Sequence, residues 1–261
     1  MRWAIDWSEG DVQVNGVHIH YQRRGLGRPI VAAHGFGDNG KCWTRLAQAL
    51  DAEYEIIAYD ARGHGLSGDA GGADPRDGND LTAVVTDLGI SKPALLGHSM
   101  GGSSVAAAVA RRPELFSCAI LEDPGWRTPE QATTPRRPAT DLSAMTVEQI
   151  EEFGRKSNLR WHDVEFGAWA ESKRQLRLRG LPSASADAWK ETVRAMNGVP
   201  VLLITADNSL GSIVTPETAE EAKRLCPSLT VLRLEGAGHN IRREAFERFV
   251  EAVRAFLAKH L

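Results

Sequence analysis

The chain has few cysteines, no long apolar run and almost no excess of charge of either sign. Its three cysteines, Cys42, Cys118 and Cys226, are widely spaced and form no C-x-x-C pair. This pattern favours reduced, structural thiols over disulfides or a metal cluster. No apolar run approaches the ~18–20 residues that a membrane helix needs, and the first ten residues contain no signal-like apolar segment. We therefore expect a cytoplasmic protein that does not bind membranes.

The charge balance also excludes several classes of partner. The 261 residues have a formal net charge of −3, with 42% hydrophobic and 25% charged residues. Such a composition is typical of a globular protein, and it offers no basic surface to nucleic acid. A P-loop lysine, a dinucleotide fingerprint and histidine pairs at metal-ligand spacing are all missing. We expect no metal, no cofactor and a small-molecule substrate, while the oligomeric state is left open.

Apolar segments alternate with helical patterns along most of the chain. A hairpin is expected around Asn15-Gly16. The expected buried strands cover 29–35, 54–60, 92–99, 117–123, 199–207 and 229–239, and the expected helices cover 41–50, 80–90, 100–112, 215–225 and 243–257. This alternation predicts an α/β fold, with parallel strands joined by crossover helices on both faces of one sheet.

The alternation stops at Asp123-Pro124 and resumes only near residue 199. Between them lies a Pro- and Thr-rich stretch, followed by helical segments that contain several tryptophans. We therefore predict a core formed by residues 1–124 and 198–261. Residues 125–197 are predicted to form a helical cap, inserted after the sixth strand at the carboxyl edge of the sheet.

The string GHSMGG at 97–102 places Ser99 between an expected strand and an Ala- and Gly-rich helix. In a nucleophile elbow the turn is so tight that small residues must flank the serine, whose hydroxyl then stands exposed above the sheet. A packed Gly-Ser turn is the alternative, but the strand-to-helix position favours the elbow. Ser99 is the predicted nucleophile.

A serine hydroxyl needs a general base, and only one of the eight histidines lies where the elbow requires it. His239 follows the last expected strand and precedes the last helix, which puts it at the same sheet edge as Ser99. His34, His64 and His98 lie in glycine-flanked turns, where structural hydrogen bonding is the expected role. His239 is therefore the predicted base.

Four motifs in order, HGFGDN (34–39), DARGHGLSG (60–68), GHSMGG (97–102) and GAGHN (236–240), resemble the α/β-hydrolase superfamily. The resemblance is to its esterase, C–C hydrolase and haloperoxidase-like branch with a serine nucleophile, and it covers all but the insertion. It implies a mostly parallel eight-stranded sheet. It also implies an oxyanion hole formed by the backbone N–H groups of Phe36 and Met100.

Three carboxylates compete for the role of orienting His239. Most of the family place this acid after the seventh strand, where the chain has ITADNSLG and only Asp207 is acidic. Some relatives place it at the end of the sixth strand instead, which corresponds to Asp123. We prefer Asp123, keep Asp207 as the alternative, and rank Glu122 third because side chains alternate along a strand.

These residues predict a cofactor-independent serine hydrolase that cleaves a small carboxylic ester or lactone through an acyl-enzyme. A C–C bond hydrolase of the same fold and a ligand-binding receptor on a hydrolase scaffold are the alternatives. Trp126 and Trp161 are candidates for lining the substrate pocket, although aromatic residues in helices more often serve packing.

Overall fold

The computed structural model describes residues 6–133, 142, 144–178, 181–182 and 187–261. Its eight strands form one sheet in the order β1-β2-β4-β3-β5-β6-β7-β8. The pairs β1–β2 and β2–β4 are antiparallel, and every other pair is parallel. The predicted α/β-hydrolase sheet is thereby confirmed. The strands are β1 (Ser8–Val14), β2 (Val17–Arg24), β3 (Arg28–Ala33), β4 (Tyr54–Tyr59), β5 (Ala94–His98), β6 (Cys118–Glu122), β7 (Val201–Thr205) and β8 (Leu229–Arg233).

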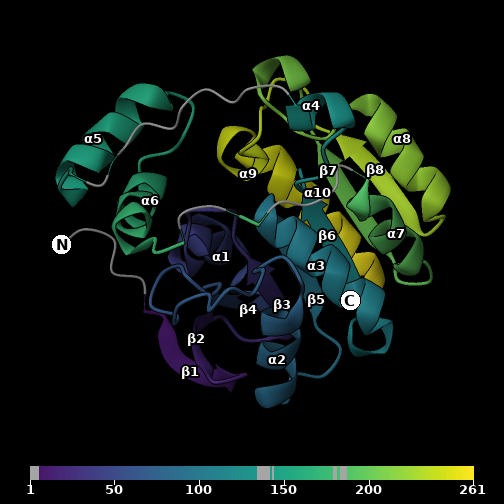
Figure 1. Ribbon diagram of the computed structural model, residues 1–261, viewed down its shortest axis with the longest axis horizontal. Coiled ribbons are helices and arrows are strands. Elements are labelled where there is room, and N and C mark those ends of the chain that lie inside the picture. Colours follow the sequence, from purple (N-terminus) through teal and green to yellow (C-terminus); the bar gives the residue numbers. More distant parts are fainter. Residues whose placement is uncertain (1–5, 134–141, 143, 179–180, 183–186) are drawn as a thin grey trace.

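Helices cover both faces of this sheet (Figure 1). The α-helices are α1 (Thr44–Leu50), α2 (Asn79–Asp87), α3 (Met100–Arg111), α4 (Pro129–Thr133), α5 (Val147–Ser157), α6 (Val164–Gln175), α7 (Ala188–Ala195), α8 (Pro216–Leu225), α9 (Ile241–Glu244) and α10 (Phe246–His260). Short 3₁₀ turns are η1 (Gly40–Trp43), η2 (Pro113–Leu115) and η3 (Asn208–Leu210). Within the described part of the chain, none of the helices combines the length and apolarity needed to span a bilayer.

The central strands are buried on both sides, which explains their nearly continuous apolar sequences. Every residue of β5, β6 and β7 is buried. Because side chains alternate along a strand, Leu95 joins the cluster formed with α2, α3, α7 and α8. Its neighbour Leu96 joins the cluster formed with α1 and α10 on the opposite face. The sheet is therefore packed between two hydrophobic cores, and the loops at its carboxyl edge extend from strands that are buried on both faces.

The predicted hairpin has the expected turn. Asn15 and Gly16 adopt φ values of 51° and 80°, the left-handed conformations that a tight two-residue hairpin requires. Ser8 to Val14 then pair antiparallel with Val17 to Arg23. The hairpin forms the antiparallel edge of the sheet, and β2 begins beside the residues that follow β4, where the His20 carbonyl accepts from the N–H of Asp60 over 2.8 Å.

The helices of the predicted cap pack in two different places. α5 and α6 pack against each other, and α6 also contacts η1 and α1 (Figure 1). α7 packs instead on α3 and α8, where Trp189 and Val193 enter the core. The cap predicted over 125–197 thus includes a C-terminal helix that lies in the helical layer covering the sheet.

Trp126 lies in this same layer, which conflicts with its predicted role in lining a substrate pocket. Its side chain is 2% exposed and stacks on Trp189, with the ring centroids 5.3 Å apart. Trp126 lies two residues after Pro124, and its indole packs against α7, where stacking and burial stabilise it. We correct the expectation: Trp126 is a packing residue.

Trp126→Ala is therefore expected to destabilise the fold by about 3–5 kcal/mol, the usual effect of emptying a buried aromatic site. Chemical denaturation followed by circular dichroism measures this change. Trp7→Ala is the matched control, because Trp7 is only partly buried, and it should cost much less. Unchanged stability of Trp126→Ala, together with a raised KM for substrate, would return Trp126 to the pocket.

Candidate active site

Ser99 stands at a strained turn between β5 and α3. Its φ of 54° and ψ of −112° are unusual for a residue with a side chain. A Cβ on Gly97 would lie 2.3 Å from the carbonyl oxygen of Gly101, and one on Gly101 would lie 2.1 Å from that of Ala33. The backbone passes too closely here for any larger residue. The turn has the geometry expected of a nucleophile elbow.

The hydroxyl of Ser99 is in line with an imidazole and a carboxylate. Ser99 Oγ lies 3.0 Å from Nε2 of His239, and Nδ1–H of the same ring donates to Oδ2 of Asp123 over 2.6 Å. The carboxylate accepts only, so this hydrogen bond fixes the tautomer and leaves Nε2 free to accept from the serine. The three side chains come from the ends of β5 and β6 and from the loop after β8.

Asp123 is fully buried and held by further donors. Its carboxylate accepts hydrogen bonds from the Ser212 hydroxyl (2.8 Å) and from the backbone N–H groups of Ile213 (2.8 Å) and Val214 (2.9 Å). These bonds compensate for the burial of the charge. They also hold the carboxylate in one orientation toward His239.

Asp207, the alternative acid, has different partners. Its carboxylate accepts from Arg233 Nη2 and from the N–H of Gly236, both at 2.7 Å. The hydrogen bond from Arg233 lowers the pKa of Asp207 below its ordinary value. Asp207 therefore supports the loop that carries His239 without touching the imidazole. Glu122, the third candidate, accepts from the backbone N–H of Arg242 over 2.8 Å and does not reach His239.

The two predicted oxyanion donors lie on opposite sides of Ser99 in the chain. Met100 is the first residue of α3, where a backbone N–H has no partner within the helix. Phe36 lies at the tip of a turn in which the N–H of Asp38 donates to the carbonyl of Gly35 over 3.0 Å. Gly37 supplies the positive φ of 77° that this turn requires.

Three other histidines surround the site in neutral form. Burial lowers the pKa of His34 to about 4 and that of His64 to about 3, and it lowers the pKa of His98 well below the ordinary value. His98 Nε2–H donates to the backbone carbonyl of His239 over 3.0 Å, with the two rings 4.7 Å apart. The expected structural roles of these residues agree with these contacts.

A buried network of charges lies behind the site, and sequence reasoning did not predict it. Asp38 Oδ2 lies 3.1 Å from Arg243 and 3.4 Å from Arg242, and its Oδ1 lies 3.0 Å from Lys173 Nζ. Burial alone would raise the pKa of Asp38, but the three cations hold it well below its ordinary value. The network continues from the two arginines to buried carboxylates, with Arg242 paired to Glu122 and Arg243 paired to Glu165.

This network joins parts of the chain that are distant in sequence. Asp38 belongs to the turn after β3, Glu122 ends β6, and the two arginines lie on α9 just after His239. Lys173 and Glu165 belong to α6 in the predicted cap. Removing Arg242 would break the ion pair of the buried Glu122, and removing Arg243 would break that of Glu165, which is strongly unfavourable. The network therefore ties α6 to the loops around Ser99.

Comparison with known proteins identifies the family to which this geometry belongs. A family model described as "Alpha/beta hydrolase family" matches residues 30–252. The chain belongs to the alpha/beta hydrolase family. This match confirms the superfamily predicted from the four sequence motifs.

Two hydrolases of this family align with nearly the whole chain. An N-formylmaleamate deformylase from Pseudomonas putida is 26% identical over 260 residues, covering 95% of this chain and 96% of that protein. A 2-(acetamidomethylene)succinate hydrolase from Mesorhizobium japonicum is 25% identical over 264 residues, covering 94% of each. A non-heme chloroperoxidase from Kitasatospora aureofaciens is 41% identical, but over only 100 residues, 36% of its length.

Solved structures of alpha/beta hydrolases share the fold over almost the full chain. An N-formylmaleamic acid deformylase from Pseudomonas putida has a TM-score of 0.76 at 23% identity, with 94% of this chain and 100% of that chain covered. An esterase from Rhodococcus has a TM-score of 0.75 at 24% identity, with 98% and 100% covered. At these identities the likeness shows the fold.

Trp161, the second candidate for the substrate pocket of this hydrolase, lies half-buried near the His239 loop. The Arg243 guanidinium lies 4.4 Å from the centre of its ring, and Phe166 stacks on it with centroids 5.8 Å apart. The preceding residue, Arg160, bonds to the carbonyl of Gly236 and to Glu244. Trp161 thus packs between α6 and Arg243 of α9, and Arg160 links the same segment to the loop after β8.

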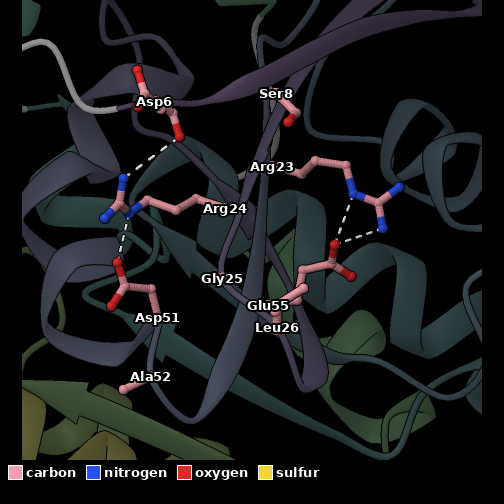
Figure 2. A pocket seen from close by; sticks show the side chains of 9 residues that line it. All are labelled: Asp6, Ser8, Arg23, Arg24, Gly25, Leu26, Asp51, Ala52 and Glu55. Atoms are coloured by element: carbon pink, nitrogen blue, oxygen red, sulfur yellow. Dashed lines mark hydrogen bonds and ion pairs between the residues drawn. The ribbon is translucent and has the colours of Figure 1, made fainter.

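A concavity of about 620 Å³ lies at the opposite edge of the hydrolase sheet (Figure 2). Its floor lies beside the first residues of β4, whereas Ser99 follows the last residue of β5. Its two arginines are neutralised, because Arg23 pairs with Glu55 and Arg24 pairs with Asp51, each at 2.6 Å. The residues that line it include Ser8 but no histidine to activate its hydroxyl, so this concavity is not the candidate active site.

The charged residues of the buried network stand next to motifs that were recognised in the sequence of this hydrolase. Asp38 lies inside the HGFGDN string, and Arg242-Arg243 follow His239 after two residues. Charged residues in such short loops are usually solvated. Nothing local indicates that α6, more than a hundred residues further along the chain, covers Asp38.

Proposed function

We propose that the protein is a serine hydrolase in which Ser99, His239 and Asp123 act as nucleophile, base and orienting acid. The observation that carries the proposal is the line from Ser99 Oγ through His239 to Asp123, at 3.0 and 2.6 Å. These lengths are within hydrogen-bond reach, as proton transfer requires. The strained elbow at Ser99 supports the same assignment.

The reaction proceeds in two halves. Ser99 Oγ attacks the substrate carbonyl carbon while His239 Nε2 takes the hydroxyl proton, and the same proton then passes to the leaving group as its bond to carbon breaks. Water attacks the acyl-enzyme in the second half, with His239 again accepting and returning the proton. Asp123 stabilises the imidazolium that forms in each half. The N–H groups of Phe36 and Met100 stabilise the oxyanion, each such donor typically contributing about 2.7–4 kcal/mol.

The favoured substrate is a small carboxylic ester or lactone. The esterase among the structural neighbours is in line with this class. A second candidate is an amide, favoured by the two relatives that align over nearly the whole chain, whose names specify an N-formyl and an acetamido compound. The same residues could serve C–C cleavage. A ligand-binding receptor without turnover is disfavoured, because Ser99 lies within hydrogen-bond distance of His239, and His239 within hydrogen-bond distance of Asp123.

The proposal is tested by hydrolysis of p-nitrophenyl esters from acetate to decanoate, beside small lactones, simple N-formyl amides and a C–C hydrolase substrate. Ester turnover is expected, with a preference for one chain length. Prior reaction with a fluorophosphonate should abolish it at one label per chain, located by peptide mapping on Ser99. The covalent label thus serves as a control within the wild-type protein. Turnover that survives complete labelling, or no turnover of any substrate, would reject the proposal.

A further inference from the structure

The carbonyl of Gly37 and the carboxylate of Asp38 both bind Lys173, a cap residue for which the proposed reaction has no role. Lys173 Nζ lies 2.6 Å from the Gly37 oxygen and 3.0 Å from Asp38 Oδ1. Ser172 Oγ lies 2.9 Å from the same carbonyl and 2.7 Å from that of Trp169, to either of which its hydroxyl donates. The C-terminal part of α6 is therefore docked on the turn that carries Phe36.

Two planar peptide units connect Lys173 to the N–H of Phe36. The peptide between residues 37 and 38 is trans, so its carbonyl points toward Lys173 while its N–H points the opposite way. That N–H, on Asp38, donates to the carbonyl of Gly35 over 3.0 Å. The peptide between residues 35 and 36 is also trans, so the N–H of Phe36 points in the direction opposite to the Gly35 carbonyl, whose oxygen accepts from Asp38. Each hydrogen bond thus sets the plane of the next peptide.

The Gly35 carbonyl has a second donor that fixes it further. His34 Nε2 accepts the N–H of Ala61 over 3.0 Å, so its other nitrogen, Nδ1, carries the proton and donates to the Gly35 oxygen over 2.8 Å. With both lone pairs of this oxygen occupied, its peptide has little freedom to rotate. The remaining freedom of the turn lies at Gly37, where the positive φ is easily changed.

We propose that Lys173 is a positioning residue that, through these two peptides, aims the N–H of Phe36 at the oxyanion. The ammonium also polarises the chain of hydrogen bonds, because each donor in such a chain strengthens the next. Docking of the cap helix α6 then completes the oxyanion hole. The inference rests on the proposed function, since it requires that an oxyanion forms at Ser99.

The test compares wild type with Lys173→Met, Lys173→Arg and the control Lys156→Met, whose lysine is exposed on α5 and pairs with Glu152. Hydrolysis of the best p-nitrophenyl ester gives kcat and KM. The inhibition constant of a short trifluoromethyl ketone measures binding of the tetrahedral oxyanion, because Ser99 adds to its carbonyl carbon as the proton moves to His239.

Lys173→Met is expected to lower kcat about 10- to 30-fold and to raise the inhibition constant of the ketone by the same factor. KM should change less than about twofold. Lys173→Arg should recover most of both losses, and Lys156→Met should match wild type. Lys173→Met within about twofold of wild type in kcat and ketone affinity would overturn the inference. A loss confined to KM would also overturn it, because that result assigns Lys173 to ground-state binding.

A second variant covers the case in which Lys173→Met does not fold. Asn39 Nδ2 donates to Gln175 Oε1 over 2.8 Å, which ties α6 to the same turn without a buried charge. Gln175→Met should lower kcat and the affinity for the ketone by one common factor, which should be smaller than the factor for Lys173→Met. Equal values for Gln175→Met and wild type would then decide against the inference. If wild type neither turns over esters nor binds the ketone, the proposed function fails and the inference with it.

Discussion

Ser99→Ala is expected to lower kcat/KM for the best ester by about 10⁴- to 10⁶-fold, the largest effect of any single change in this protein. Alanine lacks the hydroxyl that attacks the carbonyl, and among the described residues only Ser99 Oγ is hydrogen-bonded to His239 Nε2, over 3.0 Å. Only the catalysis that the oxyanion donors and substrate binding supply should remain.

Steady-state hydrolysis and mass spectrometry of the acid-quenched protein check this prediction. Wild type should show an acyl adduct on the peptide that contains Ser99, and Ser99→Ala should show none. Ser157→Ala is the control, because it removes a hydroxyl from the exposed end of α5. Turnover by Ser99→Ala at more than a tenth of the wild-type rate would exclude Ser99 as the nucleophile.

Asp123→Asn is expected to reduce kcat by about 10⁴-fold with little change in the fold. The amide is nearly the same size as the carboxylate, but it cannot carry the negative charge that stabilises the imidazolium. Its neutral amide can also favour the wrong tautomer of His239. The Ser212 hydroxyl and the Val214 N–H both donate to Oδ1, at 2.8 and 2.9 Å, so the asparagine oxygen should stay bound there while its NH2 group faces the Ile213 N–H and His239.

Asp207→Asn is the matched control for this change, since it replaces the other candidate acid in the same way. Its partners are Arg233 and Gly236, and the group is partly exposed, so kcat should stay within about threefold of wild type. Circular dichroism of both variants checks that each remains folded. Loss of turnover in Asp207→Asn, with Asp123→Asn near wild type, would reverse the assignment.

The meeting of Ser99 and His239 was predictable because the signals for both positions are local. Ser99 lies between an apolar strand and a small-residue helix, and the glycines that the turn requires are two residues away on either side. His239 follows the last strand directly. In a parallel sheet the ends of all such strands meet at one edge, so chain order alone brings these two residues together.

The carboxylate that bonds to His239 was harder to predict, because Asp123 and Asp207 both follow strands that end at this edge. What separates them in the structure is which backbone each carboxylate meets. Residues 212–214 fold over Asp123 and direct it to His239, whereas the loop before His239 turns its Gly236 N–H toward Asp207. Those loop conformations depend on tertiary packing and leave no mark in the local sequence.

Trp126 and Asp38 show that the environment of a side chain cannot be predicted from its local sequence alone. An aromatic residue next to the expected acid suggested a pocket, yet Trp126 stacks on Trp189, sixty-three positions further along the chain. Nothing in the glycine-rich loop distinguishes Asp38 from a solvated acid, yet its carboxylate is buried among Lys173, Arg242 and Arg243. Burial is a property of the assembled layers, so residues distant in sequence decide it.

The alternation of apolar strands and helical segments, with glycines at positions that permit nothing larger, was enough to establish the sheet, the elbow and the position of His239. These features depend on the periodicity of apolar residues, on the direction of the strands and on side-chain size. All three can be read from residues that are neighbours in the sequence. The partner of the imidazole, the packing of Trp126 and the link from α6 to the turn at Phe36 came only from the tertiary structure. They depend on contacts across the fold, where geometry and the cost of burying an unpaired charge select one arrangement.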